Sequence, residues 1–168
     1  MSNIKNFDLV SCLLVLILML IGLVNIYSVT YFENMDFFSI GNFFGKQLLF
    51  FSICIVIFFV SLITDIKLYF KYASLIYLLM ILILVAVLVF GNEVNGSKSW
   101  FSMFGFSFQP SEFMKPVTAL ALAKYLSNVH SDIKRRSIQF YSFLIISIPL
   151  LLIIIQPDPG TALIFLSF

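Results

Sequence analysis

Two short polar stretches interrupt an otherwise apolar sequence, and their residue types could take part in chemistry. The first, FQPSEFMKP at 108–116, carries Glu112 and Lys115 three residues apart with a proline on either side. The second, QPDPGTA at 156–162, carries Asp158 between two prolines. A carboxylate can act as a general base, and an ammonium group can stabilise a developing negative charge. The pattern points to a polar site where helices begin or end.

The first stretch is typical of a helix start. Pro110 suits the first helical position, where a missing amide hydrogen costs nothing, and Glu112 in the first turn suits the helix dipole. Because residues three apart share a helix face, Glu112 and Lys115 can form an ion pair. Pro116 should bend the helix, since it lacks an amide hydrogen and crowds the carbonyl of Glu112. The pair either simply starts the helix at the membrane interface or lines a polar cavity; Lys115, opposed by the dipole, favours the cavity.

The second stretch breaks one helix and starts another. Gln156 and Asp158 each precede a proline, which disfavours the helical conformation, so a helix must end here. Asp158 can then cap the next helix, with Pro159 in its first turn. Two interpretations stay open. Asp158 is only a helix cap, or it lines the same cavity as the first stretch, together with Gln156 and Thr161.

Composition places these stretches in a membrane protein. Hydrophobic residues make up 61% of the 168 residues and charged residues 11%, which is more apolar than soluble domains are. The net charge of +2 gives no basic field for nucleic acid. The single histidine, His130, lies in a polar stretch and makes no metal site or catalytic triad. No metal-ligand spacing is visible.

Apolar runs of about twenty residues predict the transmembrane helices. We expect an all-α, polytopic bundle of five helices and the start of a sixth, forming a single domain over 1–168. The expected helices are 9–29, 48–64, 72–90, 110–126, 138–155 and a segment that begins at 159. Residues 159–168 are too short to cross a membrane, so the sequence reads as the truncated N-terminal part of a longer protein.

The positions of lysine and arginine predict a cytoplasmic N-terminus. That orientation puts seven basic residues inside and three outside. The inside set is Lys5, Lys67, Lys71, Lys124, Lys134, Arg135 and Arg136, and the outside set is Lys46, Lys98 and Lys115. Both polar stretches then face the outer compartment, beside an aromatic-rich loop at 91–109 that contains Trp100 and marks the membrane interface.

Four stretches resemble, in order and spacing, the RodA/FtsW/SpoVE (SEDS) family of bacterial cell-wall synthesis. They are NGSKSWF at 95–101, FQPSEFMKP at 108–116, ALAKYL at 121–126 and QPDPGTALIF at 156–165. The opening Gln156 resembles the RodA branch more than the FtsW branch. The resemblance implies a multi-pass protein of the bacterial inner membrane that acts in cell shape, cell division and peptidoglycan synthesis. It implies a glycosyltransferase that polymerises lipid II, an undecaprenyl-linked precursor, beside a class B penicillin-binding protein.

The resemblance also implies a substrate cavity. Its residues would be Lys98, Trp100, Gln109, Pro110, Ser111, Glu112, Lys115, Gln156, Pro157, Asp158, Gly160 and Thr161. This sequence has Ser99 where the family usually has arginine before the loop tryptophan, and Lys98 could supply the charge instead. We hypothesise that Lys115 and Lys98 offer positive charge to a lipid diphosphate, and that Glu112 and Asp158 order the cavity or bind a cation. No cofactor is evident, and a divalent cation stays open.

The resemblance covers only the first half of the family's length. The acidic residue regarded as catalytic in that family lies in a loop of the second half, so the catalytic residues are unknown here and enzyme activity stays open. Two alternatives remain. One is a transporter or flippase for a lipid-linked precursor, and the other is a non-catalytic remnant that scaffolds a penicillin-binding protein.

Overall fold

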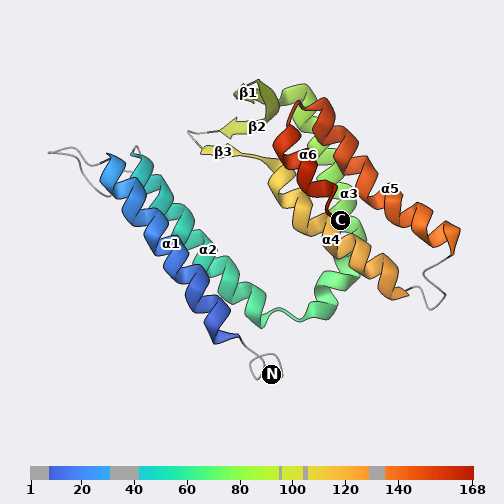
Figure 1. The fold of residues 1–168 in the computed structure, drawn as a ribbon, viewed down its shortest axis with the longest axis horizontal. Helices are drawn as coiled ribbons and strands as arrows, with labels where there is room; N and C mark the ends of the chain where they lie inside the picture. The colour runs from blue at the N-terminus through green and yellow to red at the C-terminus, as the bar shows by residue number, and fades with distance from the viewer. Residues whose placement is uncertain (1–7, 31–41, 95, 104–105, 129–134) are drawn as a thin grey trace. The chain divides into compact units, whose positions relative to one another are not determined.

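The chain folds into two compact units, residues Met1–Asp65 and Ile66–Phe168. The computed structural model describes residues 8–30, 42–94, 96–103, 106–128 and 135–168 (Figure 1). Lys5, His130 and Lys134 lie outside these ranges. The described elements are α1 Leu9–Thr30, α2 Phe43–Ile63, α3 Ile66–Phe90, β1 Asn92–Val94, β2 Ser97–Met103, β3 Phe106–Phe108, α4 Pro110–Asn128, α5 Arg136–Ile155 and α6 Pro159–Phe165.

The helical membrane fold expected from the sequence is confirmed. Within the described ranges, α1, α2, α3 and α5 are long and apolar enough to cross a membrane. α2 and α3 begin five and six residues before the apolar runs that predicted them, because each helix continues through lysines such as Lys46 and Lys71. Such side chains can reach the headgroup layer from a helix end. The cytoplasmic N-terminus and the single domain stay predictions.

The first unit is a pair of helices. α1 and α2 run side by side in opposite directions (Figure 1). Tyr27 on α1 meets Phe44 on α2 edge to face, with ring centroids 5.5 Å apart. Both helices are apolar around their whole circumference and expose most of their side chains within this unit. Such a surface suits contact with lipid or with further helices.

An aspartate caps the start of α1. The carboxylate of Asp8 accepts hydrogen bonds from the amides of Val10 and Ser11, at 3.1 and 3.2 Å, and from the Ser11 hydroxyl at 2.5 Å. The hydrogen bond from the Ser11 side chain is the largest cause that lowers the pKa of Asp8 below its ordinary value of 3.8. These bonds satisfy amide groups that have no partner inside the helix.

The second unit is a bundle around one apolar core. Each of its four helices contributes to the cluster of Leu84, Met114, Ile153, Ala162 and Phe165. α6 is only seven residues long, yet it buries Thr161, Ala162 and Phe165. Because lipid tails are as apolar as these side chains, the cluster stabilises the bundle mainly through close packing. It includes Met114 of the first polar stretch and Ala162 of the second, and therefore helps to position both.

A small antiparallel sheet covers one end of this bundle, in the order β1–β2–β3. The sequence analysis expected an interfacial loop here and did not predict strands. Phe101 pairs with Phe108 across β2 and β3, in keeping with the preference of aromatic residues for strands. Gly96, with φ of 81°, turns the chain between β1 and β2 in a conformation that favours glycine. At Gly91, a Cβ atom would collide with the carbonyl oxygen of Val87.

A tyrosine on α3 compensates for a proline inside α5. Pro149 has no amide hydrogen, so the carbonyl of Ile145, one turn earlier, loses its helical partner. The hydroxyl of Tyr77 donates a hydrogen bond to that carbonyl at 2.9 Å. An unpaired backbone group costs several kcal/mol in a lipid environment. This bond therefore ties α3 to α5 at the point where α5 is weakest.

Acidification should loosen the first turn of α1. Because the pKa of Asp8 is lowered in the folded state, its charged cap stabilises the helix when the pH is above the ordinary pKa of 3.8. This stabilisation is lost as the pH falls through the folded-state pKa. We expect the hydrogen-exchange protection of the Val10 and Ser11 amides to fall when pH is lowered from neutral to below that range. Asp8→Asn keeps a cap without the charge, so its protection should not respond to pH. An unchanged pH response in this variant would contradict the assignment.

Tyr77→Phe should destabilise the fold by about 1 kcal/mol, because it leaves the Ile145 carbonyl unpaired. Pro149→Ala restores a helical partner to that carbonyl, so Tyr77→Phe should cost clearly less in that background. The free energy of unfolding in detergent micelles measures both effects. Tyr72→Phe, an exposed residue on the same helix, is the control. Equal costs of Tyr77→Phe in both backgrounds would rule out the proposed pairing.

Candidate polar site at the sheet end of the bundle

The structure brings the two polar stretches together through one hydrogen bond. The amide nitrogen of the Gln109 side chain donates to a carboxylate oxygen of Asp158 at 2.7 Å. Gln109 directly precedes α4, and Asp158 directly precedes α6. The bond therefore joins the starts of two helices that are 49 residues apart in the sequence.

Asp158 is also the cap of α6. One carboxylate oxygen accepts the Thr161 amide at 3.2 Å, and the other accepts the Thr161 hydroxyl at 2.8 Å. Pro159 occupies the first turn, as the sequence predicts. With Gln109, three donors hold this carboxylate in one orientation. Asp158 therefore caps α6 with a half-buried carboxylate, and its place in a cavity shared with the first polar stretch stays a prediction.

Gln156 lies deeper than the sequence analysis expected. The residue is fully buried, and its side-chain nitrogen donates to the backbone carbonyl of Leu84 on α3 at 3.1 Å. Its own backbone carbonyl accepts hydrogen bonds from the Lys98 amide at 3.1 Å and the Ser97 hydroxyl at 2.9 Å. Gln156 thus connects α3, β2 and the end of α5. Its Oε1 atom has no partner among the described residues.

Residues 97–100 of β2 are buried or half-buried. Ser99 stands where the family that the sequence resembles usually has arginine. It is fully buried, and its hydroxyl lies 2.8 Å from that of Ser97. The Lys98 ammonium donates to the carbonyl of Val89 at 3.2 Å, in the last turn of α3, where a cation suits the helix dipole. Trp100 is half-buried and pairs with Asn92 of β1. None of these contacts brings the Lys98 charge to Asp158.

Glu112 and Lys115 form a separate ion pair on α4. Their charged atoms lie 2.7 Å apart, with 51% of the Glu112 side chain and 19% of the Lys115 side chain exposed. The pair spans i to i+3, as the spacing predicts, and Pro116 follows within the helix. In the described parts of the chain, no hydrogen bond connects this pair to Asp158. Ser111 beside it is fully buried, and its hydroxyl has no partner among the same residues.

A pocket of about 510 Å³ opens beside Asp158, between α5 and α6. Its walls are mostly aliphatic and include Leu150, Ile154, Leu163 and Leu166. Among the predicted cavity residues that the structure describes, Asp158 and Pro157 line this pocket, whereas Glu112, Lys115 and Gln156 do not. The predicted cavity residues thus lie in four places: the node of Gln109 and Asp158, the ion pair on α4, the buried Gln156, and β2 with Lys98 and Trp100.

No group of three or more potential metal ligands occurs in the ranges that the structure describes. Glu112 and Asp158, the pair expected to hold a cation, belong to separate clusters, and Asp158 already accepts three hydrogen bonds. A divalent cation at this end of the bundle stays a prediction. The sequence analysis missed Tyr77 and Ser97, although Pro149 inside an apolar run signals that a carbonyl there needs another donor.

Known proteins resemble the chain along nearly its whole length. Residues 8–168 match the family model for FtsW, RodA and SpoVE, described as cell cycle protein. The probable peptidoglycan glycosyltransferase FtsW of Buchnera aphidicola is 34% identical, over 98% of this chain and 44% of its own length. Stage V sporulation protein E of Bacillus subtilis is 34% identical, over 95% of this chain and 45% of its own length. The peptidoglycan glycosyltransferase RodA of Treponema pallidum is 33% identical, over 98% and 37%.

Solved structures share the fold. The rod shape determining protein RodA of Thermus thermophilus matches with a TM-score of 0.82 and 28% identity, over 96% of this chain and 50% of its own. A chain of a peptidoglycan synthase complex, described as coordinating polymerization and crosslinking, matches with a TM-score of 0.80 and 28% identity, over 96% and 45%. The chain spans about half the length of these relatives or less. It belongs to the FtsW/RodA/SpoVE family of cell cycle proteins, as a multi-pass helical membrane protein.

Proposed function

We propose that this chain forms the N-terminal half of a peptidoglycan glycosyltransferase that polymerises lipid II in the bacterial inner membrane. Two relatives that match nearly all of this chain carry the name peptidoglycan glycosyltransferase. The observation that carries the proposal is the bond between Gln109 and Asp158, because it joins the two stretches on which the family resemblance rests. A class B penicillin-binding protein is the proposed partner, in keeping with the related chain from a peptidoglycan synthase complex.

The separate clusters suggest separate roles. Glycosyl transfer from a lipid diphosphate requires positive charge near the leaving group. Lys115 carries such a charge at the sheet end of the bundle, and Glu112 holds its ammonium group in place. We assign Lys115 to the diphosphate. Lys98 would first have to leave the Val89 carbonyl to contribute, so we give it a minor role.

Asp158 acts in this proposal as a positioning residue. Its carboxylate fixes the start of α6 and, through Gln109, the start of α4. Lys115 lies on α4, close to the first residue of that helix. Gln156, two residues before Asp158, is hydrogen-bonded to α3 through its side chain and to β2 through its backbone carbonyl. Gln156 also supports our assignment to the RodA branch, although the FtsW, SpoVE and RodA relatives match at similar identities of 34, 34 and 33%.

Asp158→Ala should lower the free energy of unfolding by about 1 kcal/mol, because the α6 cap and the bond to Gln109 are both lost. Asp158→Asn should cost only a few tenths, since asparagine caps helices equally well. Denaturation in detergent micelles measures the difference. Ser167→Ala removes an exposed hydroxyl just after the same helix and is the control. If Asp158→Ala matched the unsubstituted protein in stability, the carboxylate would not be the link between the two helices.

The activity is tested with purified protein in which these 168 residues are joined to the second half present in the relatives. We expect it to convert labelled lipid II into polymer without any other transferase. Lys115→Gln should reduce the rate at least about 100-fold, as the loss of one charge-stabilising group does in other enzymes. Lys46→Gln, which removes a lysine from the other unit, should polymerise normally.

The same assay separates the competing functions. Lipid II that crosses a vesicle membrane without being polymerised would indicate a transporter. Protein that folds and binds a penicillin-binding protein, but neither polymerises nor moves lipid II, would indicate a scaffold. Normal polymer from Lys115→Gln would remove Lys115 from the proposed site while leaving the glycosyltransferase assignment in place.

A further inference from the structure

Charges in the unit Ile66–Phe168 are segregated between its two ends. Its described carboxylates lie at the sheet end: Glu93 on β1, Glu112 in the first turn of α4, and Asp158 before α6. Besides Lys67 in the first turn of α3, four cations lie at the opposite end, near the start of α3, the end of α4 and the start of α5. They are Lys71, Lys124, Arg135 and Arg136. Within the described part of this unit, none of these four forms an ion pair with a carboxylate.

Two of the cations are held close together by a backbone contact. The ammonium group of Lys124 on α4 donates to the backbone carbonyl of Lys71 on α3 at 3.1 Å. The Lys71 ammonium lies 5.3 Å from the centre of the Tyr72 ring. Neither contact neutralises a charge. Two like charges on adjacent helices therefore remain available to an external anion.

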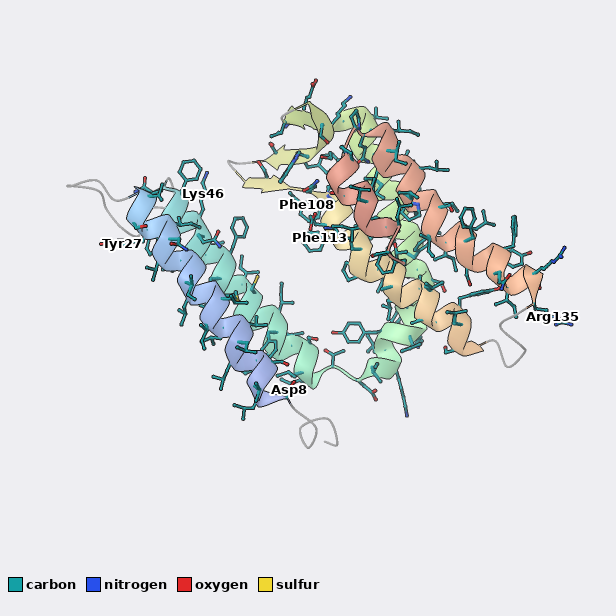
Figure 2. All side chains as sticks on the ribbon, in the orientation of Figure 1. Asp8, Tyr27, Lys46, Phe108, Phe113 and Arg135 are labelled. Atoms are coloured by element: carbon teal, nitrogen blue, oxygen red, sulfur yellow. The ribbon has the colours of Figure 1, made fainter. Side chains whose placement is uncertain are left out.

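An aromatic contact brings the two arginines to the same end. Tyr125, next to Lys124, meets Tyr141 of α5 with ring centroids 6.3 Å apart. This contact places the first turns of α5 beside the last turns of α4. Arg135 and Arg136 are exposed there, and Figure 2 shows the Arg135 side chain projecting from the start of α5.

The tyrosines also indicate the depth of this end in the membrane. Tyrosine is enriched where the hydrocarbon core meets the headgroups, because its ring is apolar and its hydroxyl is polar. Tyr72 and Tyr141 are exposed and Tyr125 is half-buried. Tyr72 and Tyr141 lie near the starts of α3 and α5, which are long and apolar enough to cross the membrane, and Tyr125 lies near the end of α4. The four cations therefore lie at the level of lipid phosphates.

We propose that this basic–tyrosine surface, made of Lys71, Lys124, Arg135, Arg136, Tyr72, Tyr125 and Tyr141, binds the headgroup phosphates of anionic phospholipids. Arginine can engage a phosphate with two parallel hydrogen bonds, and lysine adds a mobile point charge. Membrane lipids are the anions in reach at this depth, which favours them over free phosphate or an acidic protein segment. The surface lies at the end of the unit opposite the proposed glycosyltransferase site and is independent of it.

The test compares lipid retention by the purified chain in neutral detergent, measured by native mass spectrometry with phosphatidylglycerol or phosphatidylcholine added. We expect phosphatidylglycerol to be retained about tenfold better, since each basic residue near the surface adds to the attraction. Lys71→Gln with Lys124→Gln should reduce this preference to about twofold or less. Lys46→Gln, which removes a lysine from the other unit, should leave the preference unchanged.

Three further measurements use a charge-preserving variant, a change of ionic strength and competition by inorganic phosphate. Lys71→Arg with Lys124→Arg preserves both charges and should keep the preference. If the glutamine variant does not fold, the unsubstituted chain still tests the idea, because the preference must fall when ionic strength is raised from ~0.05 to ~0.5 M. Displacement of the lipid by millimolar inorganic phosphate would indicate a free-phosphate site. Equal retention of the two lipids, or an equal loss in Lys46→Gln and in Lys71→Gln with Lys124→Gln, would overturn the proposal.

Discussion

The need to pair every backbone polar group inside an apolar environment governs this fold. Prolines interrupt α5 and the α5–α6 junction, and each interruption leaves groups that lipid cannot satisfy. The chain meets this constraint with side chains from distant and neighbouring positions. Tyr77 serves the carbonyl opposite Pro149, and Asp158 caps α6 three residues before Thr161. The buried Gln156 satisfies its own side-chain amide on the carbonyl of Leu84. Polar residues that look exceptional in so apolar a sequence are thus first of all structural partners.

This constraint changes how the polar end of the bundle is understood. Sequence spacing treats Gln156, Asp158, Glu112 and Lys115 as members of one cavity. In the structure, Gln156 is fully buried against α3, whereas the Asp158 carboxylate accepts hydrogen bonds from Gln109 and Thr161. Lys115, with Glu112, retains a charge that a substrate could meet. In the proposed function, the first stretch therefore meets the substrate and the second stretch positions the first.

The unequal distribution of charge gives the two ends of the second unit different chemistry. The sheet end combines carboxylates, lysines and a turn-rich loop, which suits recognition of a polar substrate group. The opposite end carries unneutralised cations among tyrosines, which suits a layer of lipid phosphates. The packed core of Leu84, Met114 and Ile153 separates these regions. An apolar core of this kind allows each end to be altered without direct contact with the other.

The sequence by itself determined the class of the protein, most of its helices and the positions of its two helix-breaking stretches. These properties depend on hydropathy, proline and charge spacing, which act between residues near in sequence. Strands β1, β2 and β3 escaped prediction because the density of aromatic residues there is also typical of an interfacial loop. Only the tertiary structure decided which acceptor each polar group meets. Gln156 and Leu84 are 72 residues apart, and Tyr77 and Ile145 are 68 apart, so their pairing depends on how whole helices pack against one another.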